Sequence, residues 1–381
     1  MSAHDAAPAL PSDALSAAAR PARVGVVGSG WRAEFFLRMA RLMPERSRIT
    51  GVVTRTAGRG DRVRAAWGVP TVRTVAELLA LERPDYVVVA VPWDVTPVAT
   101  GELVRSDVPV LAETPPAPDL PGLRELWSVV GPSGLVQVAE HSPFMPAHAA
   151  RAAVLRAGVI GEVTQVQISS THMYHAMALV RSMLGVGLGP VEITARRFTG
   201  PLVDPQTKDG WTGDPTPKEA GSTLGLLDFG GGRSAVYDFT DNQWHNPLRV
   251  NRLLVRGSHG ELLDDRVTRW VDARTVVTSP LVRRQIGVEQ DLDGFDLDHI
   301  SFDGRVVYRN PFQGARLADD DVAVAALMAA MAAWTAGTGP APYPLAQGSQ
   351  DHMVALAIDE AARSRSTVRT EQEPWSADAG S

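Results

Sequence analysis

The stretch RVGVVGSGWRAEFF, residues 23–36, decides the fold of the first part of the chain. A short apolar run ends in a glycine, and apolar residues then recur at helical spacing. Between them, GSGWRA at 28–33 fits the pattern G-x-G-x-x-G/A, in which the first glycine permits a tight turn and the second lets backbone amides approach a pyrophosphate. The stretch therefore predicts a dinucleotide-binding turn at the start of a helix. Its predicted cofactor contacts are Gly28, Ser29, Gly30, Trp31 and Arg32.

The turn opens a region in which apolar strands alternate with helices. Further strands are expected at 49–55, 85–92, 108–113 and 134–140, with helical segments between most of them. Strands this apolar are covered on both faces, and the alternation builds a right-handed, mostly parallel sheet. Residues 23–145 are therefore predicted to form an α/β domain of the doubly wound Rossmann type.

The pattern changes after this region to strands of alternating polarity joined by short glycine-rich turns, which is typical of an antiparallel sheet. Helices are expected at 319–337 and 349–364, and a long loop with four prolines at 200–222. Residues 146–366 are therefore predicted to form an α+β domain for substrate binding and oligomerisation, with a large, mostly antiparallel open sheet. An exposed sheet face of this kind predicts a homodimer or homotetramer.

The composition excludes several classes of protein. With 381 residues, a net charge of −6 and no cysteine, the chain has no basic footprint for nucleic acid and no disulfide, thiolate nucleophile or zinc–thiolate site. No apolar run approaches the roughly 20 residues needed to span a bilayer. Residues 1–22 lack the basic start and apolar core of a secretion signal and are predicted to be a disordered tail, as residues 367–381 are predicted to be flexible. We expect a cytoplasmic protein with a small-molecule substrate and no nucleic-acid or membrane partner.

The end of the second strand indicates which cofactor is preferred. An Asp or Glu there would bind the ribose hydroxyls of NAD, but the chain has Thr54-Arg55. A hydroxyl and a guanidinium suit a 2′-phosphate, which an acidic side chain would repel. We therefore expect NADP, with NAD as a possible cofactor and Thr54 and Arg55 as contacts. The alternative is that these residues only solvate a helix end.

Pro92 and Trp93 follow another strand at the carboxyl edge of the sheet, where ligands bind in such folds. They are predicted to wall the nicotinamide site. Trp93 is equally consistent with an ordinary aromatic residue on the rim.

Several stretches, in this order, resemble the glucose–fructose oxidoreductase / inositol dehydrogenase / rhizopine-catabolism (Gfo/Idh/MocA) family. They are VGVVGSGWRAEFF, VVVAVPWDVTP, VPVLAETPPA, FMPAHAARAAVLRAGVIGEV and HAMALVRSMLG, and the similarity covers residues 23–366. The resemblance implies hydride transfer between a nicotinamide cofactor and a sugar, polyol or related carbohydrate. It also implies a second domain whose open sheet commonly forms the oligomer interface. These motifs are specific for the superfamily and not for a substrate.

The chain departs from this family at the usual acid–base residues. The family carries a lysine in a Glu-Lys-Pro motif, where this chain has Glu113-Thr114-Pro115. The family's His-x-x-Asp-type helix keeps its histidine as His175, but Ala178 takes the place of the aspartate. Thr114 can donate a hydrogen bond to a substrate oxygen or a cofactor ribose, but it cannot act as a general acid near neutral pH. Glu113, at the end of its strand, is assigned to the cofactor site.

The segment THMYH at 171–175 offers the remaining proton-handling groups. His175 is the predicted acid–base residue, because a histidine with a pKa of about 6.5 can exchange a proton with a carbinol oxygen and because it keeps the family position. Tyr174 is an orienting donor or a second acid, and His172 shares a helical face with His175. The alternative role for His175 is that of a hydrogen-bonded histidine between the domains. The catalytic candidates are thus His175, His172, Tyr174 and Thr114.

Two further expectations concern the same region. No metal site is predicted, because no acidic side chain or third histidine stands near His172 and His175 in the sequence. Glu140 and His141, which follow the last strand of the first domain, are ranked second as residues that line the cleft.

Three functional hypotheses remain. The first is an NAD(P)-dependent oxidoreductase acting on CH–OH groups of a carbohydrate-derived or other hydroxylated small molecule. The second is a non-redox enzyme that uses tightly bound NAD(P) for elimination or glycoside cleavage. The third is a catalytically inactive cofactor-binding protein.

Overall fold

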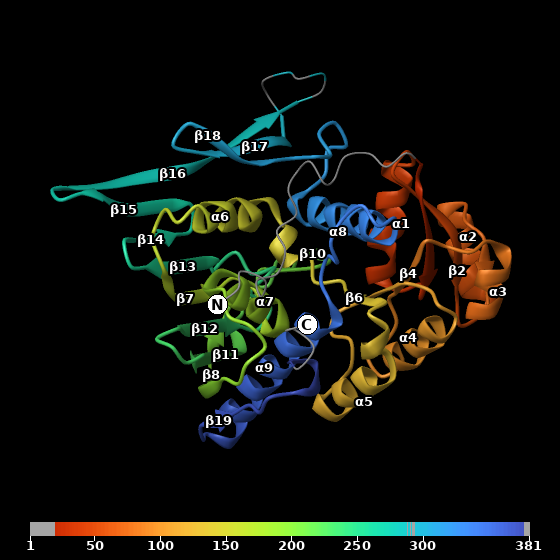
Figure 1. The fold of residues 1–381 in the computed structure, drawn as a ribbon, viewed down its shortest axis with the longest axis horizontal. Helices are drawn as coiled ribbons and strands as arrows, with labels where there is room; N and C mark the ends of the chain where they lie inside the picture. Colours follow the sequence, from red (N-terminus) through yellow and green to blue (C-terminus); the bar gives the residue numbers. More distant parts are fainter. Residues whose placement is uncertain (1–19, 288, 290, 292–293, 377–381) are drawn as a thin grey trace.

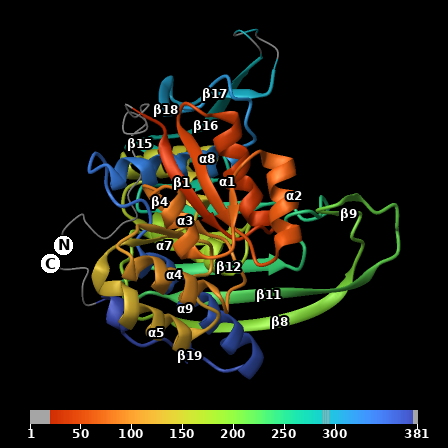
Figure 2. The same ribbon diagram turned by 90° about the vertical axis from the view of Figure 1, so that its right-hand side faces the viewer.

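The structure is a computed structural model that describes residues 20–287, 289, 291 and 294–376. It contains two α/β regions, one on each side of a group of helices (Figures 1 and 2). The predicted fold class, a Rossmann domain followed by a large, mostly antiparallel sheet, is confirmed. None of the helices in the described ranges is long and apolar enough to cross a membrane.

The first region is a parallel sheet of six strands in the order β3-β2-β1-β4-β5-β6. Helices cover both faces of this sheet. The two central strands, β1 and β4, are therefore buried along nearly their whole length. The strands are β1 (Ala22–Val27), β2 (Ser47–Val53), β3 (Thr71–Val72), β4 (Tyr86–Val89), β5 (Val110–Ala112) and β6 (Val136–Val138). The helices are α1 (Trp31–Leu42), α2 (Ala57–Trp67), α3 (Val75–Leu81), α4 (Thr96–Arg105), α5 (Leu120–Val130) and the 3-10 turn η2 (Gly131–Ser133).

The second region is a sheet of 11 strands in the order β18-β17-β16-β15-β14-β13-β7-β12-β11-β8-β19. Only β7 and β12 pair in parallel; the other neighbours in this sheet are antiparallel. The inner strands are β7 (Val163–Ser169), β8 (Glu192–Leu202), β11 (Lys218–Asp228), β12 (Ser234–Thr240), β13 (Arg252–Gly257) and β14 (Gly260–Leu263). The others are β15 (Arg266–Asp272), β16 (Thr275–Ile286), β17 (Asp296–Phe302), β18 (Arg305–Arg309) and β19 (Val368–Arg369).

Helices α7 and α9 lie between the large sheet and the Rossmann sheet (Figure 1). Their apolar residues merge with both sheets into one buried cluster, so the two regions share a core. The helices of this part are η3 (Ser142–Phe144), α6 (Pro146–Arg156), α7 (Met173–Leu184), α8 (Asp319–Thr335), α9 (Leu345–Ser364) and η5 (Pro374–Ser376).

Helix α8 differs from the expected division of the chain. It was predicted within the second domain, but it packs beside α1 and joins the core on that face of the Rossmann sheet (Figure 1). The reason is its composition: most residues from Val322 to Met331 are buried, and a helix that is apolar all round must be enclosed. The chain therefore returns to the first domain after the second sheet is complete.

The predicted loop at 200–222 is largely wrong. Strand β8 runs to Leu202 and β11 begins at Lys218, with a short hairpin of β9 (Gln206–Thr207) and β10 (Gly210–Trp211) between them. The prolines stay compatible with strands here because they lie near strand ends and in the connection. Figure 2 shows β8 and β11 as a long curved ribbon that ends at this hairpin.

The flexible segment predicted from residue 367 is also wrong as far as Ser376. Strand β19 pairs with β8, and the indole of Trp375 is fully buried with its Nε1 donating to Gln350 Oε1 over 2.9 Å. Arg124 and Glu373 form an ion pair at 2.7 Å that fastens the same segment to α5. The polar composition of this segment gave no indication that one large apolar residue, Trp375, would anchor it in the core. Residues 1–19 and 377–381 of the two predicted tails lie outside the described residues.

Candidate functional site

The glycine turn has the geometry that a pyrophosphate site requires. Gly28 has φ of 119°, and a Cβ there would lie 2.0 Å from the carbonyl oxygen of Ala90, so only glycine fits between β1 and β4. Gly30 is the N-cap residue of α1, and a Cβ built on it has open space around it. The helix N-terminus is thus accessible to an anion, and the residues present fit a dinucleotide.

Arg32 and Glu113 face each other across this edge of the sheet. Arg32 Nε donates to Glu113 Oε1 over 2.7 Å, and the second Glu113 oxygen accepts from the amide of Thr114 at 3.2 Å. Both side chains are largely buried. Arg32 and Glu113, both predicted to contact the cofactor, therefore form an ion pair with each other. Direct contact of either side chain with a cofactor stays a prediction.

The end of β2 differs from the sequence interpretation at Thr54. Its side chain is buried and its hydroxyl lies 3.2 Å from a guanidinium nitrogen of Arg73, which also donates to the Thr54 carbonyl. The Thr54 hydroxyl therefore already has a protein partner, and its contact with a 2′-phosphate stays a prediction. Arg55 is exposed as expected, and Arg73 is a second guanidinium at this edge that sequence reasoning missed because it follows β3 rather than β2.

The predicted aromatic wall is accessible. Trp93 is 52% exposed and Trp31 is 67% exposed, and Pro92 is exposed beside Trp93. Large apolar side chains on the carboxyl edge of a Rossmann sheet are consistent with a ligand wall and with an ordinary rim. Their cofactor role stays a prediction.

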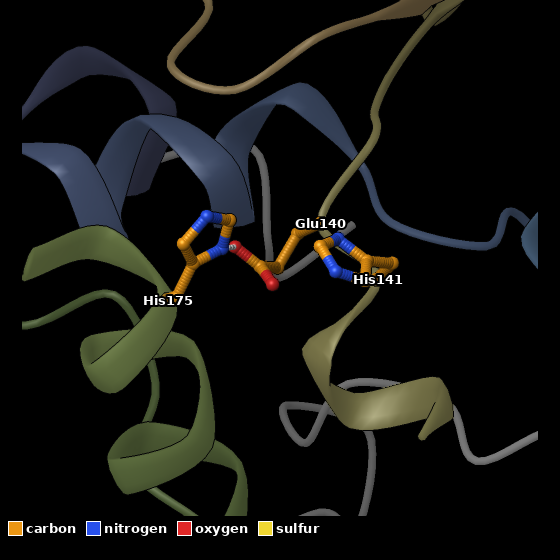
Figure 3. A group of neighbouring side chains, drawn as sticks. All are labelled: Glu140, His141 and His175. Atoms are coloured by element: carbon orange, nitrogen blue, oxygen red, sulfur yellow. Dashed lines mark hydrogen bonds and ion pairs between the residues drawn. The ribbon is translucent and has the colours of Figure 1, made fainter. Parts of the chain in front are cut away.

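The predicted acid–base residue has a buried carboxylate as its partner. His175, near the start of α7, places its Nδ1 2.6 Å from Oε2 of Glu140, which follows β6 (Figure 3). Glu140 is almost completely buried, and its other oxygen accepts from the amide of Ser142 at 2.9 Å. Burial alone would raise the pKa of Glu140, but the charge and hydrogen bond of His175, with His141 and Ser142, lower it to about 2.

His141 belongs to a second histidine–carboxylate pair. Its Nδ1 lies 3.1 Å from Arg32, whose guanidinium can only donate, so this nitrogen accepts. Its Nε2 lies 2.8 Å from Asp320 of α8 and therefore carries the hydrogen. The rings of His141 and His175 lie 5.6 Å apart, on the two sides of Glu140 (Figure 3). Burial alone would raise the pKa of Asp320, but the hydrogen bond with His141 and the charge of Arg32 leave it lowered.

The other predicted catalytic side chains gather around His175. The rings of Tyr174 and His172 lie 4.5 and 5.3 Å from it, and Thr114 interacts with Tyr174. Burial and the nearby charge of Glu140 raise the pKa of Tyr174. Burial, with the charge of His175, lowers the pKa of His172 to about 3, so His172 is neutral at physiological pH. The structure therefore brings His175, His172, Tyr174 and Thr114 together.

The start of α7 carries a backbone feature beside these groups. Met173, between His172 and Tyr174, has φ of 46°, and its amide donates to the hydroxyl of Tyr237 over 3.1 Å. A left-handed conformation is unfavourable for a residue with a side chain and persists where the surroundings hold it. The hydrogen bond to Tyr237 holds this residue at the start of α7, two positions before His175.

Glu140, His141 and His175 each offer one ligand atom within 4.8 Å of the others. The fold thus supplies the acidic side chain that the sequence did not place near His175. Tetrahedral ligands of a zinc ion would stand about 3.3 Å apart, given metal–ligand bonds of about 2.0–2.1 Å. The 2.6 Å between Glu140 and His175 is instead the length of a charge-assisted hydrogen bond, and Arg32 adds a positive charge beside His141. We assign no metal to these residues.

No lysine replaces the one missing from position 114. The chain has only two lysines, Lys208 and Lys218, and both are exposed on the β8–β11 ribbon and its hairpin. The titratable groups within reach of His175 are therefore imidazole, phenol and carboxyl groups. Glu140 could be suspected from its position after a strand, whereas nothing in the sequence points to Asp320, which a distant helix delivers.

The comparisons with known proteins agree with this geometry. Residues 22–140 match the family described as "Oxidoreductase family, NAD-binding Rossmann fold" (GFO_IDH_MocA). The resemblance inferred from the sequence is confirmed over this part of the chain, because residues 22–140 match the NAD-binding Rossmann domain of that family. Among curated proteins, no sequence match was found.

Solved structures share the fold along almost the whole chain. An oxidoreductase from Agrobacterium radiobacter in complex with NAD+, L-tartaric acid and magnesium has a TM-score of 0.65 at 16% identity, over 91% of this chain and 98% of that one. A myo-inositol dehydrogenase from Corynebacterium glutamicum ATCC 13032 has a TM-score of 0.64 at 18% identity, over 92% and 99%. A levoglucosan dehydrogenase in complex with NADH and levoglucosan has a TM-score of 0.64 at 14% identity, over 92% and 99%. At these identities the similarity establishes the fold.

Proposed function

We propose that the protein is an NAD(P)-dependent oxidoreductase that acts on a CH–OH group of a carbohydrate-derived or similarly hydroxylated small molecule. The observation that carries the proposal is the position of His175. Its ring lies against Tyr174, which in turn meets Thr114 at the carboxyl end of β5, the edge of the sheet where a Rossmann domain holds its nicotinamide. Dehydrogenases of inositol and levoglucosan share this fold and support the substrate class.

The residues divide the reaction into two transfers. A bound nicotinamide would supply the acceptor or donor of hydride at the carbinol carbon. In the direction of oxidation, His175 takes the hydroxyl proton on Nε2 as the C–H bond breaks and the C=O bond forms. In the direction of reduction, the same nitrogen returns the proton to the oxygen. Thr114 and Tyr174 offer hydrogen bonds to the reacting oxygen or to a neighbouring hydroxyl.

The experiment is to follow NADPH and NADH at 340 nm with a panel of sugars, polyols and lactones. His175→Ala should reduce kcat at least 100-fold, because a positioned general acid–base contributes about 10²–10⁴-fold. His299→Gln is the matched control, since His299 also pairs with a carboxylate, Asp298 at 2.9 Å, but on β17. Equal turnover by wild type and His175→Ala would contradict the proposal. Substrate conversion without net oxidation of NADPH would favour elimination or glycoside cleavage.

The cofactor proposal is NADP, with NAD as the alternative. Arg55, Arg59 and Arg62 follow β2 on the surface and form no ion pair with any described residue, and Arg73 stands beside them. Guanidinium groups without an ion pair suit a 2′-phosphate, and Thr54 and Arg55 supply no carboxylate to accept from a free ribose hydroxyl.

A substitution at Arg55 tests this choice. Arg55→Ala should raise the KM for NADPH about tenfold or more, since a hydrogen bond to a charged group contributes about 1.5–3 kcal/mol, and should leave the KM for NADH unchanged. Arg64→Ala serves as control, because Arg64 already pairs with Asp61 and Thr71. An equal effect of Arg55→Ala on both cofactors would contradict NADP preference.

A further inference from the structure

The site contains a carboxylate whose surroundings are organised around one histidine. Glu140 is removed from water, and an isolated buried carboxylate is costly unless charged or hydrogen-bonding groups compensate it. Its Oε1 is held by the amide of Ser142, and its Oε2 points at Nδ1 of His175 at 2.6 Å. Figure 3 shows the carboxylate between the rings of His175 and His141, directed at the first. The carboxylate is therefore fixed at both oxygens before any ligand binds.

This contact determines where the hydrogen of His175 resides. An ionised carboxylate only accepts hydrogen bonds, so Nδ1 of His175 must carry a hydrogen. In the neutral ring the lone pair then lies on Nε2, on the opposite side of the ring from Glu140. Among the described residues, Nε2 has no hydrogen-bond partner. Nε2 is thus available to exchange a proton with a ligand, whereas Nδ1 is already bound to Glu140.

The remaining charged and titratable groups around His175 cannot take over this task. From α8, Asp320 is bound to His141, and from β5, Glu113 is bound to Arg32 of α1. On α7 itself, Tyr174 and His172 contact the His175 ring edge or face and carry no negative charge at physiological pH. Thr114 and Ala178 have no titratable group. Glu140 is therefore the carboxylate that acts on His175.

We propose that Glu140 is the positioning residue that sets the tautomer and the orientation of His175, and so makes acid–base chemistry possible in a site that lacks lysine. The inference rests on the proposed function, in which His175 exchanges the proton. Glu140 does not touch the substrate in this arrangement; it acts through the ring.

The first test reads the tautomer in the wild-type protein and uses a variant only to assign the signals. In wild-type protein labelled with ¹⁵N-histidine, the ring nitrogens of His175 are assigned by their loss in His175→Gln. The ¹⁵N shifts of the neutral ring should report hydrogen on Nδ1 and a lone pair on Nε2. A neutral His175 with its hydrogen on Nε2 would overturn the proposal, whether or not a substrate has been found.

The second test replaces the carboxylate by an amide of the same shape. Glu140→Gln should give a mixture of His175 tautomers and lower kcat at least tenfold, because an amide can either donate to Nδ1 or accept from it. Asp298→Asn makes the same change beside His299 and should leave the tautomer of His175 and the activity unchanged. An unchanged tautomer of His175 and an unchanged kcat in Glu140→Gln would overturn the proposal.

The two readouts separate this inference from the proposed function. In one outcome no substrate is turned over, but the Nδ1 hydrogen is present in wild type and partly lost in Glu140→Gln. This outcome would refute the oxidoreductase reaction and leave the positioning of His175 intact. In the other outcome turnover depends on His175 but not on Glu140, and wild type and Glu140→Gln show the same single tautomer. This outcome would refute the positioning role of Glu140 and leave the oxidoreductase reaction intact.

Discussion

His175 and His141 show how two similar histidine–carboxylate pairs differ in what they can do. His141 is bound on both ring nitrogens, by Arg32 and by Asp320, so it has no free nitrogen for a ligand. His175 is bound on one nitrogen only, by Glu140. The difference follows from the element that carries each ring. His141 contacts Arg32 of α1 and Asp320 of α8, whereas His175 lies at the first turn of α7, which packs beside η3.

His352 makes a prediction about pH and stability at the scale of one residue. It is buried on α9, its Nε2 donates to the carbonyl of Pro118 at 3.3 Å, and its Nδ1 has no partner. Burial lowers its pKa to about 4, with the hydrogen bond to Pro118 opposing that shift. The unfolded chain therefore binds more protons between about pH 6.5 and pH 4, and the free energy of unfolding must fall as the pH falls through that window.

His352→Gln should remove this dependence. Urea unfolding should show that this histidine lowers the free energy of unfolding of wild type by about 2 kcal/mol between pH 8 and pH 5. The estimate takes about 1.4 kcal/mol for each pH unit below 6.5. The variant should lose correspondingly less between the same two pH values. Parallel stability curves for the two proteins from pH 8 to pH 5 would contradict the assignment.

Residues whose role depends on local geometry could be predicted from the sequence, and those that depend on distant partners could not. Gly28 was identifiable because its turn needs a positive φ and a close neighbour. His175 was identifiable from a motif. The contact of Thr54 with Arg73 could not be predicted, because Arg73 follows a different strand. Asp320 gave no signal, because its contact with His141 exists only once α8 has packed on α1.

The same rule applies to whole elements. The alternating strands and helices of the Rossmann sheet were predictable because each short segment carries its own periodicity. The packing of α8 against that sheet was not predictable, because a helix that is apolar on all sides does not indicate which core it will join. The segment after α9 was misjudged for a similar reason: β19 has only two residues, and its position depends on pairing with β8.

This terminal segment yields a prediction about stability. Trp375 is fully buried, donates to Gln350, and lies 6.4 Å from the ring of Trp127 on α5. Trp375→Ala should lower the free energy of unfolding by about 3–5 kcal/mol, the usual loss for a large buried aromatic residue. The control is Trp211→Ala, which removes an indole that is 74% exposed and should change stability by less than about 0.5 kcal/mol. Chemical denaturation measures both, and equal midpoints would show that the segment is not anchored.

At the scale of the whole molecule, the two faces of the large sheet have different surroundings. Helices α7 and α9 cover one face, where residues such as Ile193 and Leu227 are buried. On the other face, β8 and β11 expose Phe198, Leu224 and Leu226, which belong to alternate positions of the same strands. Exposed apolar side chains that adjoin on one face are typical of an interface, and a sheet face of this kind suits a second copy of the chain.

The resulting proposal is a homodimer or homotetramer that buries this face, and Leu226→Glu is its test. Leu226 is 61% exposed and belongs to the apolar group, so a carboxylate there would be buried without a partner in the assembly. Light scattering after size-exclusion chromatography should give a dimer or tetramer for wild type and a smaller species for the variant. Val98→Glu is the control, because Val98 is 69% exposed on α4, on the Rossmann domain. A monomeric wild type, or an assembly that withstands Leu226→Glu as well as Val98→Glu, would place the interface elsewhere or remove it.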